Sequence, residues 1–132
     1  SVEAGSEISL FHRLILFGVS WVLFPGAAAI VTVVLGVKDR FVPWVILHNW
    51  GVVWLWMFLA LVSLMRTAGL MSQDFFVFVM FLYSYLRFLA HWRIAYISLG
   101  VPTITSAFAT AVPLVMGFIS QVLIYQAFMP PA

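Results

Sequence analysis

The sequence predicts an all-α protein that crosses a lipid bilayer four times, with its helices in one bundle. Of its 132 residues, 65% are hydrophobic and 8% are charged, and the mean hydropathy is +1.16. Soluble domains are about 45–50% apolar and about 25% charged. The chain also contains several apolar stretches of the roughly 20 residues needed to cross a 30 Å hydrocarbon core. So short a chain cannot bury this much apolar surface within itself, and we expect it to face lipid or other subunits.

Short segments with turn and helix-capping residues divide the chain into four predicted spans within a single domain over residues 1–132. Pro43 suits the first turn of a helix. Gly69 is a candidate C-terminal stop and Ser72 a candidate N-cap. Gly100 and Pro102 predict a tight turn. The spans are expected over residues 14–37, 41–65, 75–99 and 103–128.

Small residues in the first and last spans predict where these helices pack. One strip is Gly26–Ala29, and the other comprises the small residues of Ser106–Ala111. Lys38 and Arg40 lie in the first loop and favour the cytoplasmic side, so both termini are expected outside.

The composition excludes several classes of function. The net charge is only +2, from six Lys and Arg against four Asp and Glu, which is too little basic charge for a nucleic-acid-binding surface, so no nucleic acid partner is expected. There is no Cys, hence no disulfide framework and no Cys-based metal site. All four acidic residues lie in the tail or loops, and no catalytic motif is present, so the chain is not expected to be catalytic by itself. Ser1 in place of Met suggests a processed chain.

Two histidines are candidate cofactor ligands. His48 lies near the start of the second span and His91 near the end of the third. Because successive spans are antiparallel, both should lie near the same membrane face at similar depth. Facing imidazoles on neighbouring helices are what a bis-histidine haem b requires, and either could ligate a chlorophyll magnesium. The alternative is hydrogen bonding to nearby backbone or to lipid headgroups.

A polar stripe follows the third span. Tyr83, Arg87 and His91 are spaced by four residues and share a helical face, and Gln121 in the fourth span could complete the stripe. Ionisable residues at membrane depth favour a quinone pocket or a proton path. Alternatively, if the third span effectively ends at Arg93, Arg87 can snorkel to the interface, where both arginines would bind a phospholipid headgroup, anionic ones in particular.

Two short patterns resemble the membrane anchors of succinate dehydrogenase. Ser9-Leu10-Phe11-His12-Arg13 is similar to the Ser-x-x-His-Arg segment of the large cytochrome subunit. His48-Asn49-Trp50 followed by Trp54 is similar to a segment of the small cytochrome subunit. The resemblance implies a quinone site at Ser9 and Arg13 and a haem ligand at His48.

The leading hypothesis from the sequence is a small, non-catalytic subunit of an energy-transducing complex, in particular a respiratory oxidoreductase. It would act as an anchor or scaffold among other membrane subunits and phospholipids, with quinone, haem or lipid contact. The expected location is the mitochondrial inner membrane or the bacterial plasma membrane. Two alternatives stay open: a proton-path or transporter subunit that uses Arg87 and His91, and a pigment-binding photosynthetic accessory subunit.

Overall fold

The protein is described by a computed structural model, which defines the backbone over residues 4–128 and the side chains over residues 10–127. Four long helices account for nearly all of this part of the chain, and it contains no strand. They are α1 (Ala4–Val34), α2 (Phe41–Thr67), α3 (Gln73–Leu99) and α4 (Thr103–Phe128), and a 3-10 turn, η1 (Lys38–Arg40), precedes α2. The predicted helical class is confirmed, and all four helices are long and apolar enough to cross a membrane.

The first connection ends α1 earlier than the sequence predicted. The helix stops at Val34 instead of residue 37, because Gly36 adopts a φ of +71°. The Val37 N–H then donates to the Thr32 carbonyl at 2.8 Å, and the Gly36 N–H to the Val33 carbonyl at 3.1 Å. This pair of bonds is a Schellman motif, which satisfies carbonyls that the helix end leaves free.

The second connection follows the predicted residues. Gly69, with a φ of +76°, ends α2, and the Ser72 hydroxyl accepts a hydrogen bond from the Phe75 N–H at 3.3 Å as the N-cap of α3. The Arg66 guanidinium donates to the Gln73 side-chain oxygen at 2.8 and 3.0 Å and to the Met71 carbonyl at 3.3 Å. The arginine therefore closes the connection between the two helices.

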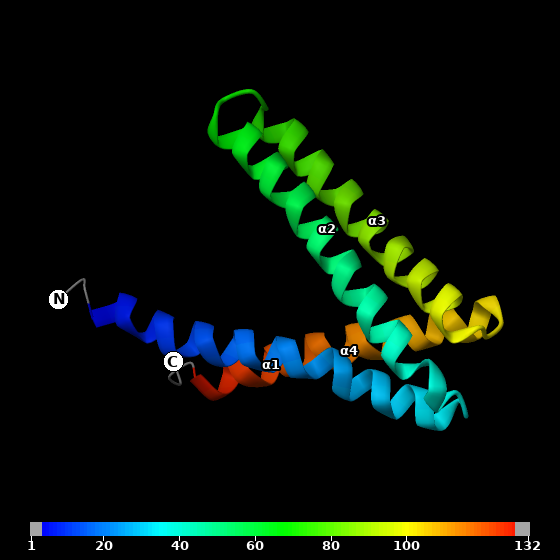
Figure 1. The fold of residues 1–132 in the computed structure, drawn as a ribbon. Helices are drawn as coiled ribbons and strands as arrows, with labels where there is room; N and C mark the ends of the chain where they lie inside the picture. Colours follow the sequence, from blue (N-terminus) through cyan, green and yellow to red (C-terminus); the bar gives the residue numbers. More distant parts are fainter. Residues whose placement is uncertain (1–3, 129–132) are drawn as a thin grey trace.

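The helices form two antiparallel pairs that diverge in a V (Figure 1). One pair is α1 with α4, and the other is α2 with α3. The pairs meet at the end that carries the first and third connections, whereas both termini and the second connection lie toward the open end (Figure 1). The predicted side-by-side bundle is thus present only where the pairs meet.

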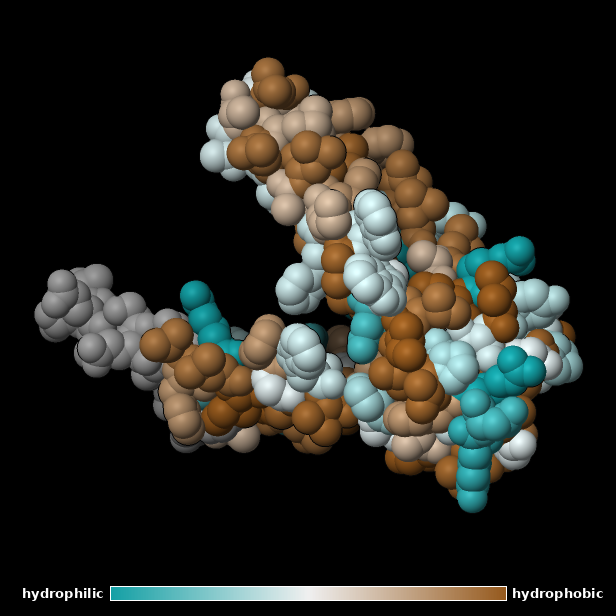
Figure 2. Space-filling model, viewed as in Figure 1, coloured by the Kyte–Doolittle hydropathy of each residue, from teal (hydrophilic) through white to brown (hydrophobic). Residues whose placement is uncertain are grey.

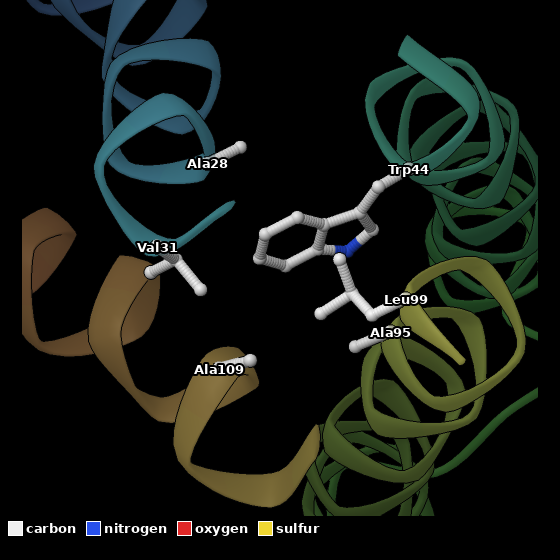
Figure 3. Close-up of a cluster of buried hydrophobic side chains, with 6 residues drawn as sticks. All are labelled: Ala28, Val31, Trp44, Ala95, Leu99 and Ala109. Carbon is white, nitrogen blue, oxygen red and sulfur yellow. The ribbon is translucent and has the colours of Figure 1, made fainter. Parts of the chain in front are cut away.

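A small apolar core closes the V at this end (Figure 3). Trp44 of α2 is 1% exposed and points between the two pairs, and Phe24 meets its ring edge-on with centroids 5.3 Å apart. The remaining core side chains are mostly small, which lets the helices approach closely. They are Ala28, Val31, Ala95, Leu99 and Ala109.

The small-residue strips lie where the sequence predicted contacts. Ala27 and Ala28 of α1 and Ser106, Ala109 and Thr110 of α4 are all buried. A polar contact ties α3 to α4 beside them: the Trp92 indole N–H lies 3.0 Å from the Ser106 hydroxyl and 3.1 Å from the Thr103 carbonyl. The Ser106 hydroxyl itself donates to the Thr103 carbonyl at 2.6 Å.

Candidate functional site

A cleft of about 500 Å³ lies between the two helix pairs, next to the apolar core. All four helices contribute to its walls, and Figure 2 shows the molecule hollowed between the two arms. Its volume falls within the usual range for small-molecule and cofactor sites, which is about 300–1,000 Å³. Its polar lining residues are Ser20, His48, Tyr83, Arg87, His91, Thr110 and Gln121.

A column of three stacked rings forms part of the cleft wall. Phe24 of α1 stacks on His48 of α2 with centroids 3.4 Å apart and planes 6° apart. His48 in turn stacks on His91 of α3, with centroids 4.6 Å apart and planes 26° apart. His48 is about 10 Å along the axis from Phe41, and His91 about 12 Å from Leu99, at the 1.5 Å rise per residue of a helix. The structure therefore brings the two histidines together near one end of the molecule, as the sequence predicted.

The stacking bears on how these histidines could hold a tetrapyrrole. A bis-histidine haem has the macrocycle between the two imidazoles, with one nitrogen of each directed at the iron. Rings in direct contact at 4.6 Å leave no space for a macrocycle between them. Haem ligation by this pair therefore remains a prediction from the sequence, and it would require the two rings to move apart.

His91 is buried without a complete set of hydrogen bonds. Its side chain is 7% exposed, and its Nδ1 atom is buried with no hydrogen-bond partner in the described part of the chain. An unsatisfied buried polar atom costs about 1–3 kcal/mol. Such a cost at the wall of a cleft is typical of a group with a functional role.

Arg87 places a positive charge in the same cleft. It lies about 18 Å along the helix axis from Leu99 and about 21 Å from Gln73, which is close to the midpoint of α3. Within residues 10–127 its guanidinium makes no hydrogen bond or ion pair, and the acidic side chains there, Asp39 and Asp74, lie in η1 and in the first turn of α3. Helix α3 continues past Arg93 to Leu99, so Arg93 lies six residues before the helix end, and snorkelling of Arg87 to the interface stays a prediction from the sequence.

The other predicted site residues lie elsewhere. Arg93 is exposed, and its guanidinium lies 5.7 Å from the centroid of the Tyr96 ring, outside the cleft lining. Arg13 is exposed on the N-terminal part of α1, also outside the cleft lining. The Ser9 side chain lies outside the described residues. Of the predicted quinone pair, the structure therefore places only Arg13, and it lies apart from the polar cleft.

Sequence reasoning missed several contributors to the cleft, among them Ser20, Phe24 and Thr110. Ser20 and Thr110 had no distinctive pattern, because hydroxyl side chains in helices commonly bond to their own backbone. Both do so here, Ser20 to the Phe17 carbonyl at 2.7 Å and Thr110 to the Ser106 carbonyl at 2.9 Å. Phe24 is one of thirteen phenylalanines, and only the packing distinguishes it.

The cleft thus combines a cation, two imidazoles, an amide and a phenol with apolar and aromatic walls. This set can bind an anion or a hydrogen-bond acceptor, and it can relay protons between neighbouring side chains. Comparisons of the chain with protein-family models, with curated proteins and with solved structures found no match. Any assignment of function therefore rests on the chain's own residues.

Proposed function

We propose that the chain is an integral membrane protein with four spans, and that it is a small subunit of a larger energy-transducing membrane complex. The observation that carries this proposal is the Arg87 guanidinium, which makes no hydrogen bond or ion pair within residues 10–127 and lies near the midpoint of α3 in an open cleft. Hydrocarbon offers no partner for such a charge, and charged side chains at membrane depth pair with other groups or face water. A neighbouring subunit or a bound molecule supplies the missing partner.

The molecular surface supports the same proposal. The accessible surface of the chain is 9642 Å², whereas a compact soluble protein of 14.9 kDa exposes about 7000 Å². In the most apolar 18-residue segment of each helix, only 6–17% of the residues are buried. Most apolar side chains therefore point away from the chain's own core, toward lipid or other subunits.

The respiratory setting rests on the sequence and on the cleft chemistry. Ser9–Arg13 and His48–Trp54 resemble segments of succinate dehydrogenase anchors, and the cleft brings His48 together with His91. Imidazoles beside a cation within a membrane are typical of proteins that handle electrons or protons. The chain itself supplies no catalytic motif, so it acts as a scaffold that contributes side chains to a site shared with other subunits.

Purification of the tagged chain from its native membrane in mild detergent tests this proposal. Native mass spectrometry should find it with other membrane subunits, including redox proteins, and the absorption spectrum of the complex should separate haem, chlorophyll and no pigment. The control is Phe81→Leu, which changes an outward-facing side chain that is 77% exposed. Recovery of the chain as a stable, functional monomer would contradict the proposal.

The topology can be tested with single cysteines because the chain has none. Asp39→Cys lies in the first connection and Leu70→Cys in the second. A membrane-impermeant thiol reagent should label these two variants from opposite sides of the membrane. Labelling of both from the same side would exclude four spans.

A proton path is the second candidate, and the shared cleft specifically favours it. Arg87, His91 and Gln121, which the sequence places on two helices, all line this space. A path requires water in the cleft, so Leu114→Cys in its wall should react with a charged thiol reagent. Val115→Cys, an exposed neighbour outside the lining, is the control. Absence of labelling at residue 114 would favour a scaffold with an occupied cleft.

A further inference from the structure

We infer that a transmembrane helix of a partner subunit docks in the cleft and carries an aspartate or glutamate whose carboxylate pairs with Arg87. This inference rests on the proposed function, since it names what fills the cleft in the complex. The charge of Arg87, its depth and the residues that line the cleft each favour such a helix.

Charge favours a carboxylate partner because the chain supplies none at this place. Arg87 makes no ion pair within residues 10–127, and Asp39 and Asp74, the acidic side chains of that range, lie near helix ends. His91 lies one turn further along α3, and its buried Nδ1 atom also lacks a hydrogen-bond partner in the described structure. An uncharged occupant would leave the guanidinium unpaired, which is costly at membrane depth.

Depth distinguishes a protein partner from a lipid headgroup. Arg87 lies about 18–21 Å from either end of α3, so it is near the centre of a hydrocarbon core of about 30 Å. Lipid phosphates lie at the core boundary, about 15 Å from that centre. An acidic side chain in the middle of another membrane helix reaches this level without displacing a headgroup.

The residues that line the cleft also suit a helix. Helices in membranes approach closely over small residues, and the α1 and α4 wall presents Ser20 and Gly117. Trp56 of α2 and Phe118 of α4 also line the cleft, yet they are 62% and 68% exposed. Exposed aromatic side chains around an arginine are typical of the residues that dominate binding at protein interfaces.

Photo-crosslinking in the native membrane tests the inference directly. Phe118 is replaced by benzoylphenylalanine in a chain that keeps Arg87. The control is the same replacement at Phe108, which lies on the same helix and is 69% exposed but does not line the cleft. Crosslinking at 118 should yield a partner protein whose crosslinked peptide belongs to an apolar span with an Asp or Glu.

Charge substitution provides the second measurement. Arg87→Gln should reduce recovery of the crosslinked partner with the tagged chain at least about tenfold, since truncating one member of a buried charge pair is strongly unfavourable. Arg93→Gln makes the same change on the same helix outside the cleft, and recovery should stay within about twofold. Arg87→Asp combined with replacement of the partner's acid by arginine should restore recovery.

The outcomes separate this inference from the proposed function. If the chain purifies in a complex but position 118 crosslinks only to lipid or small molecules, the docking inference is overturned and the subunit proposal stands. A crosslinked protein segment without an acidic residue also overturns it. If the chain is recovered alone, both fail. Should the Arg87→Gln chain fail to accumulate, the crosslink decides, because it is made with Arg87 intact.

Discussion

The hydrogen bond from the Trp92 indole can be used to measure what ties α3 to α4. The N–H points at two acceptors, the Ser106 hydroxyl at 3.0 Å and the Thr103 carbonyl at 3.1 Å. Trp92→Phe removes the donor, but the Ser106 hydroxyl keeps its own bond to the Thr103 carbonyl at 2.6 Å. No buried donor is left unsatisfied, so the loss should be about 1 kcal/mol.

A double-mutant cycle isolates the contribution of the Ser106 contact. Polar contacts between membrane helices couple by about 0.6 kcal/mol on average and at most about 1.7 kcal/mol. The indole retains the Thr103 carbonyl as an acceptor in Ser106→Ala, so we expect coupling near the average. Reversible unfolding in mixed micelles, followed by far-ultraviolet circular dichroism, measures each free energy.

A control variant and two possible outcomes distinguish the hydrogen bond from the packing of the indole ring. Trp54→Phe makes the same change at a side chain that is 67% exposed, and its unfolding free energy should stay within about 0.5 kcal/mol. Zero coupling between Trp92 and Ser106 would show that the contact of the indole with the Ser106 hydroxyl contributes nothing to stability. A loss above about 3 kcal/mol for Trp92→Phe would show that ring packing dominates instead.

Three further predictions follow from the backbone and from Arg87. A methyl group on Gly51 would lie 2.6 Å from the Ile94 Cδ1 atom, and moving that atom should offset most of the roughly 1 kcal/mol that alanine gains over glycine inside a helix, so Gly51→Ala should be near neutral in the same titration. Ile94→Val deletes that atom, so in the Ile94→Val chain Gly51→Ala should stabilise by about 1 kcal/mol; an equal effect of Gly51→Ala in both chains would contradict this. Gly100 has a φ of +62°, so Gly100→Ala should cost about 1–2 kcal/mol and Gly100→Asn less, and equal losses would refute a conformational cause. Arg87→Leu should favour membrane insertion of the third span by about 3 kcal/mol in a glycosylation assay, more than Arg93→Leu nearer the helix end, and equal gains would place both arginines at one depth.

Most of the fold could be predicted because membrane helices obey a strong local rule. Any backbone in hydrocarbon must satisfy its own hydrogen bonds, so apolar length alone indicates each helix. Gly69, Ser72 and Gly100 marked their boundaries for the same local reason, since caps depend on the residues beside them. The end of α1 was missed by three residues because Gly36 was not recognised as a left-handed cap.

The angle between the helix pairs could not be predicted in this way. It depends on which side chains fill the end where the pairs meet, and there Trp44 is large whereas Ala28, Ala95 and Ala109 are small. The sequence placed His48 and His91 at one depth, but the contact between their rings depends on side-chain rotation and on Phe24, which stacks on His48. Such contacts between distant residues leave no periodic pattern in a single chain.

The divergence of the two helix pairs has a consequence for the surrounding bilayer. Both connections that join the pairs lie at one end, so the outline of the molecule widens toward the termini (Figure 1). With another helix seated between the arms, the assembly takes more area from the lipid layer beside the termini than from the opposite layer. Many such tapered units set side by side would bend a membrane so that its convex surface is the one on which the termini emerge.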